Sequence, residues 1–310
     1  MLDIDSLYRR SVLATADAPW VKRFLERNGW RLGVGRFVAG RDVTEAVPKL
    51  QAIQAAGKRV ILDVLGEFVT TEAAARVTSE RILASIEVVR EADVEPYFSV
   101  KPTQIGLGVA PQLALELASG IARRLAEVGG RLCLDMENSP QVDGTLELLT
   151  RLRADGHEHV GTVLQSYLHR TPADLERLLA LSPAPSLRIV KGAYKEPAEI
   201  ALQSKADVDA AFERLVKRGL EAGAYVAIAT HDKRLLERLL AFISGAGFTD
   251  ERYGVQMLYG VSPGLQDRLT AAAEPLRVYV PFGDDWYGYY SRRLAERPAN
   301  LMFVLRGLFG

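Results

Sequence analysis

A stretch near the C-terminus, "WYGYYSRRLAE" (residues 286–296), places two adjacent arginines among aromatic side chains. On a helix, the i, i+3, i+4, i+7 spacing puts four of its side chains on one face: Tyr289, Arg292, Arg293 and Glu296. Guanidinium groups bind carboxylates through paired, charge-assisted hydrogen bonds. The stretch therefore predicts either a solvated basic helix, which is the commoner case, or a helix that holds a small carboxylate. The opposite side is expected to anchor the helix through Tyr287, Tyr290 and Leu294.

Short apolar runs recur along the chain, and amphipathic stretches with helical spacing separate them. There are eight such runs: 60–67, 96–101, 131–138, 160–167, 186–194, 224–231, 253–260 and 276–283. Eight β-α units without a linker predict a (βα)8 barrel of the TIM type, an α/β fold. A doubly wound sheet is the alternative, but no G-x-G-x-x-G turn follows the first run. Residues 1–57 precede the barrel and are expected to form an accessory helical segment, which leaves 58–310 as the barrel domain.

A barrel carries its catalytic groups at the C-terminal ends of its strands. Side chains capable of chemistry stand there on most of the predicted strands: Glu67, Lys101, Asp135, Glu137, Gln165, Arg188, Lys191, Thr230, His231, Gln256 and Tyr279. One polar residue at a strand end usually marks only the start of a loop. A ring of them indicates an active site. The "HEH" run at 157–159 precedes a predicted strand and is therefore assigned to the opposite, structural face of the barrel.

Composition excludes several other functions. The 310 residues contain 39 basic and 39 acidic side chains, so no global field draws the protein to nucleic acid. A single cysteine, Cys133, excludes an intrachain disulfide and fits a reducing compartment. The N-terminus lacks the pattern of a signal peptide, and no apolar run approaches the roughly 18 residues of a spanning helix. The expected location is the cytoplasm.

Three chemistries remain open from the residues alone. A divalent metal is one, because carboxylate and imidazole ligands are available in Glu67, Asp135, Glu137 and His231. A Schiff-base lyase that uses Lys101 or Lys191 as its nucleophile is another. The third is a site for an anionic ligand, which the density of basic side chains on the same rim favours. A non-catalytic binding protein would have little need for so many titratable groups.

Seven motifs occur in a defined order: "SVKPTQIG", "LCLDMEN", "VLQSY", "RIVKGAY", "ATHD", "QMLYG" and "YYSRRLAE". Over about residues 60–300 the chain thereby resembles the FAD-dependent proline dehydrogenases, of the single-function bacterial type. The resemblance implies a distorted barrel whose last helix lies over the barrel mouth. It also implies oxidation of L-proline to Δ1-pyrroline-5-carboxylate, with hydride transfer to the flavin N5.

The resemblance assigns roles to residues where the motifs match. It implies catalytic roles for Lys101, Asp135, Arg188 and Tyr279. The expected substrate site comprises Lys101, Tyr194, Leu258, Tyr279, Tyr289, Arg292, Arg293 and Glu67, the last pairing with the first arginine. The expected FAD site comprises Asp135, Met136, Gln165, Arg188, Val190, Lys191, Gly192, Ala193, Thr230, His231, Gln256, Leu258 and Glu296. Met136 and Asp232 depart from the family pattern at the edge of the cofactor site.

The resemblance also implies where the electrons go. The chain has neither a nicotinamide-binding motif nor a cysteine cluster for an iron–sulfur relay. The expected acceptor is therefore a membrane quinone, as in the family. A neutral chain without an obvious amphipathic anchor predicts peripheral membrane contact at most.

Overall fold

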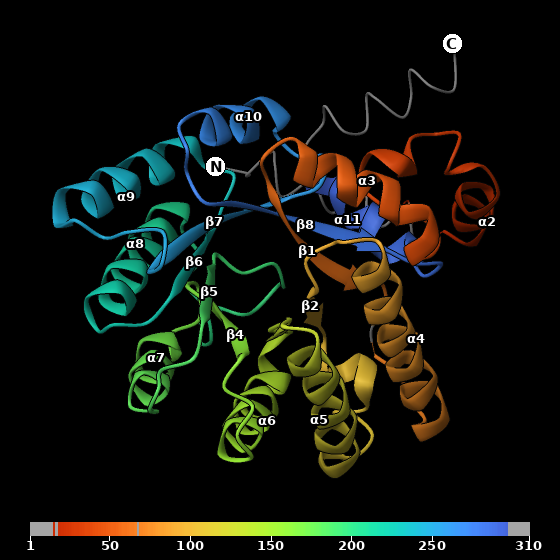
Figure 1. The fold of residues 1–310 in the computed structure, drawn as a ribbon, viewed down its shortest axis with the longest axis horizontal. Coiled ribbons are helices and arrows are strands. Elements are labelled where there is room, and N and C mark those ends of the chain that lie inside the picture. Colours follow the sequence, from red (N-terminus) through yellow and green to blue (C-terminus); the bar gives the residue numbers. More distant parts are fainter. Residues whose placement is uncertain (1–14, 16–17, 67, 297–310) are drawn as a thin grey trace.

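The computed structural model describes residues 15, 18–66 and 68–296, and within them the chain forms a closed barrel of eight parallel strands (Figure 1). The strands are β1 (Arg59–Val64), β2 (Tyr97–Val100), β3 (Arg131–Leu134), β4 (Val160–Gln165), β5 (Leu187–Val190), β6 (Val226–Ala229), β7 (Tyr253–Leu258) and β8 (Leu276–Phe282). Each strand pairs with its successor in the sequence, and β8 pairs with β1 to close the barrel. The predicted (βα)8 barrel is confirmed.

The strands are shorter than the apolar runs that predicted them. The run at 186–194 contributes only β5, which ends at Val190, because Gly192 has a φ of +116° that a strand cannot accommodate. A Cβ at position 192 would also collide with the ring of Tyr167. The chain therefore leaves the barrel immediately after each strand, and the polar residues at the ends of the runs lie at its mouth.

Seven helices surround the barrel wall: α4 (Glu72–Glu91), α5 (Pro111–Glu127), α6 (Val142–Ala154), α7 (Thr171–Leu179), α8 (Lys205–Glu221), α9 (Lys233–Ala246) and α10 (Pro263–Ala271). Short 3-10 helices, η2 (Pro102–Ile105) and η3 (Ser139–Gln141), follow β2 and β3. Side chains cap several helices: Thr71, Ser204 and Asp232 each accept a hydrogen bond from the backbone N–H three residues later. The seven helices cover the outer face of the strands, and the closed barrel encloses the inner face, so both faces are covered as a parallel sheet requires.

The helices before β1 and after β8 depart from the arrangement of a regular (βα)8 barrel. Before β1 come α2 (Pro19–Asn28), η1 (Val34–Arg36) and α3 (Val43–Ala55), and α3 packs on β1 and β8. It thus takes the wall position that the last helix of a regular barrel would fill. The last helix, α11 (Tyr287–Glu296), instead contacts α2. A second apolar core joins them: Leu25, Leu32, Val34, Phe37, Val38, Leu65, Trp286, Tyr289, Tyr290 and Leu294.

The opposite, N-terminal end of the barrel carries structural polar contacts. His159 of the "HEH" run contacts the carbonyl oxygen of Ala122 through its Nε2 at 2.8 Å, in keeping with a structural role. Buried Arg277, on β8, donates two hydrogen bonds to the carboxylate of Glu95 at 2.7 and 2.8 Å. The guanidinium also lies 5.1 Å from the ring centroid of Tyr97.

We expect the loss of either partner of this ion pair to lower the free energy of unfolding, but by different amounts. Glu95→Ala leaves a buried guanidinium without its carboxylate and should lower the free energy of unfolding by about 3 kcal/mol or more. Arg277→Met leaves Glu95, whose side chain is 36% exposed, to be hydrated, and should cost about 1 kcal/mol. Chemical denaturation of the two variants measures both values. An equal loss of unfolding free energy in the two variants would mean that the burial of Arg277 does not determine the cost of breaking the pair.

Candidate active site

A cavity of about 760 Å³ lies at the carboxyl ends of the strands, and it is lined by residues that lie on, or directly after, each of the eight strands. This volume is in the upper part of the range typical of ligand and cofactor pockets, ~300–1,000 Å³. Helix α11 adds Tyr289, Arg292 and Arg293 from the side opposite the strands. It therefore covers the barrel mouth with the polar face that the sequence predicted, while Tyr290 on its other side is fully buried and donates a hydrogen bond to the carbonyl of Leu32 at 3.0 Å.

The structure brings nearly all the predicted site residues together in this cavity. They are Lys101, Asp135, Met136, Gln165, Arg188, Val190, Lys191, Gly192, Ala193, Tyr194, Thr230, His231, Gln256, Leu258, Tyr279, Tyr289, Arg292 and Arg293. Glu67 lies outside the described residues, as does the side chain of Glu296. The cavity also has contributors that the expected substrate and FAD sites lack: Asp63, Glu137, Val163, Lys205, Ala229, Asp232, Met257 and Val261. Of these, Glu137 was among the strand-end groups that the sequence predicted.

Asp135 accepts hydrogen bonds from three different side chains. Its Oδ1 accepts hydrogen bonds from Arg188 Nη1 at 2.6 Å and from Ser99 Oγ at 2.5 Å, and its Oδ2 accepts one from Tyr279 at 2.8 Å. Burial disfavours the charged carboxylate, but the positive charges of Arg188 and Lys101 outweigh it and lower the pKa of Asp135. Asp135 is therefore a fixed negative charge that orients the surrounding donors.

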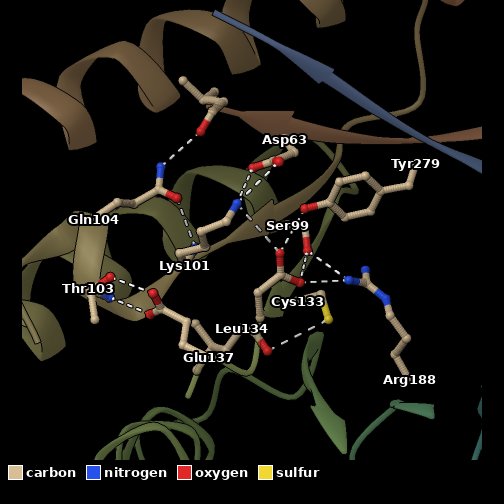
Figure 2. A network of polar contacts seen from close by, with 12 residues as sticks. Asp63, Ser99, Lys101, Thr103, Gln104, Cys133, Leu134, Glu137, Arg188 and Tyr279 are labelled. Atoms are coloured by element: carbon tan, nitrogen blue, oxygen red, sulfur yellow. Dashed lines mark hydrogen bonds and ion pairs between the residues drawn. The ribbon is translucent and has the colours of Figure 1, made fainter. Parts of the chain in front are cut away.

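Lys101 is held by a second carboxylate, from Asp63, which the sequence prediction missed (Figure 2). Lys101 Nζ donates to the two oxygens of Asp63 at 3.0 and 3.2 Å and lies 4.0 Å from Asp135 Oδ2. Burial raises the pKa of Asp63 despite the opposing charge of Lys101. The pKa of Asp63 is raised whereas that of Asp135 is lowered, because both carboxylates share Lys101 but only Asp135 also bonds an arginine.

The turn after β2 fixes the backbone of Lys101. Its N–H donates to Gln104 Oε1 at 3.0 Å, and Gln104 Nε2 donates in turn to the carbonyl of Val64 at 3.1 Å. Thr103 donates through its N–H and its hydroxyl to the two oxygens of Glu137, at 3.0 and 2.6 Å (Figure 2). Glu137 thus ties η2 to the end of β3, which is a structural role.

The metal and Schiff-base alternatives find little support in these contacts. Over the described residues, no group of three or more His, Cys, Asp or Glu side chains is arranged to hold a metal ion. His231 accepts a hydrogen bond from the backbone N–H of Leu258 at 2.9 Å through its Nε2, so that nitrogen is occupied. Lys101 and Lys191 are each bound by carboxylates, whereas a nucleophilic amine needs desolvation away from such partners.

Four alternating charges form a cluster at the rim beside β5 and β6. Lys191 lies 2.5 Å from Asp209 and 3.0 Å from Asp232, and Lys205 bonds the same two carboxylates. Although burial opposes it, hydrogen bonds from the two lysines lower the pKa of Asp232. Asp232 also caps α9 by accepting from the N–H of Leu235. This departure from the family pattern therefore fastens the loop after β5 to the rim.

Two buried side chains in the cavity have polar atoms without a partner. They are Nε and Nη2 of Arg188, which is 5% exposed, and both amide atoms of Gln256, which is 3% exposed. An unsatisfied buried donor or acceptor costs about 1–3 kcal/mol. A ligand whose ring edge carries both donors and acceptors would satisfy these groups, and a flavin has such an edge.

Comparison with known proteins decides the family. The family model for proline dehydrogenase matches residues 46–306. The chain belongs to the proline dehydrogenase family. It is 42% identical to a proline dehydrogenase of Deinococcus radiodurans over 98% of this chain and 99% of the relative. It is 35% identical to proline dehydrogenase 2 of Bacillus subtilis over 90% of this chain and 91% of that protein.

Solved structures show the same fold. Proline utilization A from Bdellovibrio bacteriovorus, inactivated by N-propargylglycine, superposes with a TM-score of 0.79 at 23% identity over 84% of this chain. Proline utilization A from Bradyrhizobium japonicum superposes with a TM-score of 0.73 at 21% identity over 88% of this chain. The chain spans about a third of the length of each of these proteins, 32%. The comparison supports the barrel and leaves the roles of individual side chains to be argued from their contacts.

We expect Asp63 to act by positioning Lys101. Asp63→Asn keeps the shape of the side chain but removes its charge, so Lys101 loses its nearest carboxylate. The Michaelis constant for proline should rise about tenfold, the value of one charge-assisted contact. Stability should change little, because Asp135 still lies 4.0 Å from Lys101 and compensates its charge, and because the charge of Asp63 is costly to bury. Exposed Asp250→Asn is the matched control. An unchanged Michaelis constant would mean that Asp135 alone holds Lys101.

Proposed function

We propose that this chain oxidises L-proline to Δ1-pyrroline-5-carboxylate with FAD as its cofactor. One observation carries the proposal: Arg292 and Arg293 descend from α11 into the cavity that holds Lys101 and Tyr279 at the strand ends. Proline has a carboxylate, a secondary amine and an apolar ring. The cavity offers cations, hydrogen-bonding groups and aromatic or leucine side chains that match these three parts.

The cationic side chains would bind the substrate carboxylate. Arg292, Arg293 and Lys101 supply two guanidinium forks and an ammonium group. Arg293 is 9% exposed, so its contact with a carboxylate would be largely shielded from water. We further propose that Glu67, which follows β1, pairs with Arg292 and helps to close the site.

The apolar side chains would surround the proline ring and exclude water from it. Tyr289, Tyr194, Leu258 and Tyr279 line the cavity around the proposed carboxylate site. Burial, with the charges of Asp135 and Asp63, raises the pKa of Tyr279 well above its usual value. Tyr279 therefore keeps its proton at physiological pH and donates a hydrogen bond to Asp135, which holds the ring in place beside the substrate.

The partly unsatisfied groups would hold the flavin. Gln256 and Arg188 offer unpartnered polar atoms, and the backbone of residues 190–193 borders the same space. The other proposed contacts are those of the sequence prediction: Asp135, Met136, Gln165, Thr230, His231, Leu258 and Glu296. When bound, FAD supplies the hydride acceptor. Arg188 stabilises negative charge near it through a guanidinium that Asp135 fixes in place.

The acceptor of the electrons and the location of the protein belong to this proposal. We propose a quinone as the acceptor, a cytoplasmic location and contact with a membrane only at its surface. Among the residues that the structure describes, none of the helices is both long and apolar enough to cross a bilayer. The division into an accessory segment, residues 1–57, and a barrel domain, residues 58–310, stays a prediction.

The cofactor and reaction are tested with the purified protein. It should be yellow, and the flavin released on denaturation should be FAD rather than FMN. Anaerobic proline should bleach the flavin band, and a water-soluble quinone should restore it whereas NAD should not. A colourless protein that FAD cannot reconstitute would contradict the proposed function, as would covalent trapping by borohydride with a carbonyl substrate.

The proposed carboxylate site is tested on α11. Arg292→Met or Arg293→Met removes a charge-assisted contact worth about 1.5–3 kcal/mol, which corresponds to a roughly tenfold to hundredfold higher Michaelis constant for proline. Lysine at either position should restore only part of the affinity, because a point charge does not reproduce the guanidinium fork. Flavin content should stay normal in all four variants. Exposed Arg268→Met on α10 is the control, and equal Michaelis constants throughout would disprove the assignment.

A further inference from the structure

The outer face of α2 carries aromatic and basic side chains together. Trp20, Arg23, Phe24 and Arg27 follow the i, i+3, i+4, i+7 spacing and form what we call the α2 stripe. Trp20 is 70% exposed and Phe24 is 44% exposed, and both arginines are exposed as well. Among the described residues, Trp20 is the most exposed of the large hydrophobic side chains. Leaving these two rings in water costs free energy that a partner surface would recover.

The region around the stripe is strongly basic, although the whole chain is neutral. Residues 18–41 contain six basic side chains, at positions 22, 23, 27, 31, 36 and 41, and one acidic side chain, Glu26. Glu26 lies 3.9 Å from Lys22, an exposed pair that offsets a single charge. Balanced charge over the full length therefore conceals a local excess of positive charge.

The opposite face of α2 is anchored in the fold. Leu25 is buried in the same apolar core as Trp286, which precedes α11, and Tyr290 and Leu294 of α11. Lys22 lies 5.7 Å from the ring centroid of Tyr287. The stripe thus lies on the face of α2 that is turned away from α11, and α2 itself is one helix removed from the cavity. Figure 1 shows α2 at the edge of the fold.

From these observations we infer that the α2 stripe docks the protein on an anionic lipid bilayer. Tryptophan and phenylalanine enter the interface between headgroups and acyl chains, and arginines extend beside them to lipid phosphates. A basic cluster gains affinity from the negative surface potential of such a membrane. Docking through α2 would bring α11 and the cavity beneath it close to the membrane. In that position the protein would deliver its electrons to a membrane quinone, a role that rests on the proposed function.

The charge of the stripe argues against a second copy of this chain as its partner. Two stripes face to face would bring four arginines together without a compensating acid on either face, which is repulsive. An anionic bilayer supplies both the apolar layer for the rings and the counter-charges for the arginines. The partner is therefore identified by chemistry as a lipid surface that carries anionic headgroups.

Vesicle sedimentation tests the docking without any turnover. The full-length protein should bind vesicles that contain phosphatidylglycerol at low salt, bind phosphatidylcholine vesicles poorly, and dissociate as the salt concentration rises. Trp20→Ser/Phe24→Ser and Arg23→Gln/Arg27→Gln should each weaken binding about tenfold or more. The matched control is Val77→Ser/Arg81→Gln on α4, which changes one exposed apolar and one exposed basic side chain elsewhere on the surface.

Three results would overturn the inference. They are an absence of binding to anionic vesicles, stripe variants that bind as well as the wild type, and stripe variants that alter the mass in light scattering but not vesicle binding. The last would show a contact between copies.

A second assay separates docking from catalysis. The stripe variants should oxidise proline at the wild-type rate with a water-soluble quinone. They should lose most of their rate with a long-chain quinone held in anionic vesicles. Equal rates in vesicles would overturn the link between docking and electron transfer. If the wild type failed to oxidise proline with either acceptor yet still bound the vesicles, the proposed function would fail while the docking surface stood.

Discussion

Four alternating charges at the barrel mouth constrain the rest of the structure. Asp63, Lys101, Asp135 and Arg188 come from β1, from the residue after β2, from the residue after β3, and from β5. Buried charges are tolerated only when they are paired and hydrogen-bonded, and the removal of one partner leaves an uncompensated charge. Because each member lies on, or directly after, a different strand, the network forms only when the barrel has closed in the correct register. The network has two positive and two negative side chains, so the charges beneath the proposed site for an anionic substrate sum to zero.

The N-terminal helices decide where the last helix lies. Since α3 packs against β1 and β8, α11 is excluded from the wall and lies over the mouth. Its apolar side chains, with Tyr290 fully buried, enter a core that the N-terminal segment supplies. Its polar face then points at the strand ends. Although none of the described residues before β1 lines the cavity, this N-terminal segment therefore orients the arginines, and through α2 it also offers a surface to the surroundings.

Much of the architecture follows from local sequence patterns. Eight apolar runs with intervening amphipathic stretches predicted eight strands, and the strand ends predicted where the cavity would be. The boundaries were too long wherever a run continued into a loop, because hydrophobicity alone does not register a positive φ such as that of Gly192. Asp63 was missed for a related reason. An acid inside the apolar run "VILDVLGE" was taken as part of a strand, and its partner Lys101 is 38 residues away.

The sequence by itself determined the α/β barrel, the family and the set of side chains at the strand ends, because these depend on periodicity and on short ordered motifs. It also indicated that Tyr289, Arg292 and Arg293 share one helical face, since 3.6-residue periodicity is a local property. Only the tertiary structure decided which carboxylate holds Lys101, that Glu137 is bonded to η2 and His231 to the end of β7, and which face of α2 is exposed. These are pairings and exposures between distant segments, and they arise when the closed barrel brings those segments together.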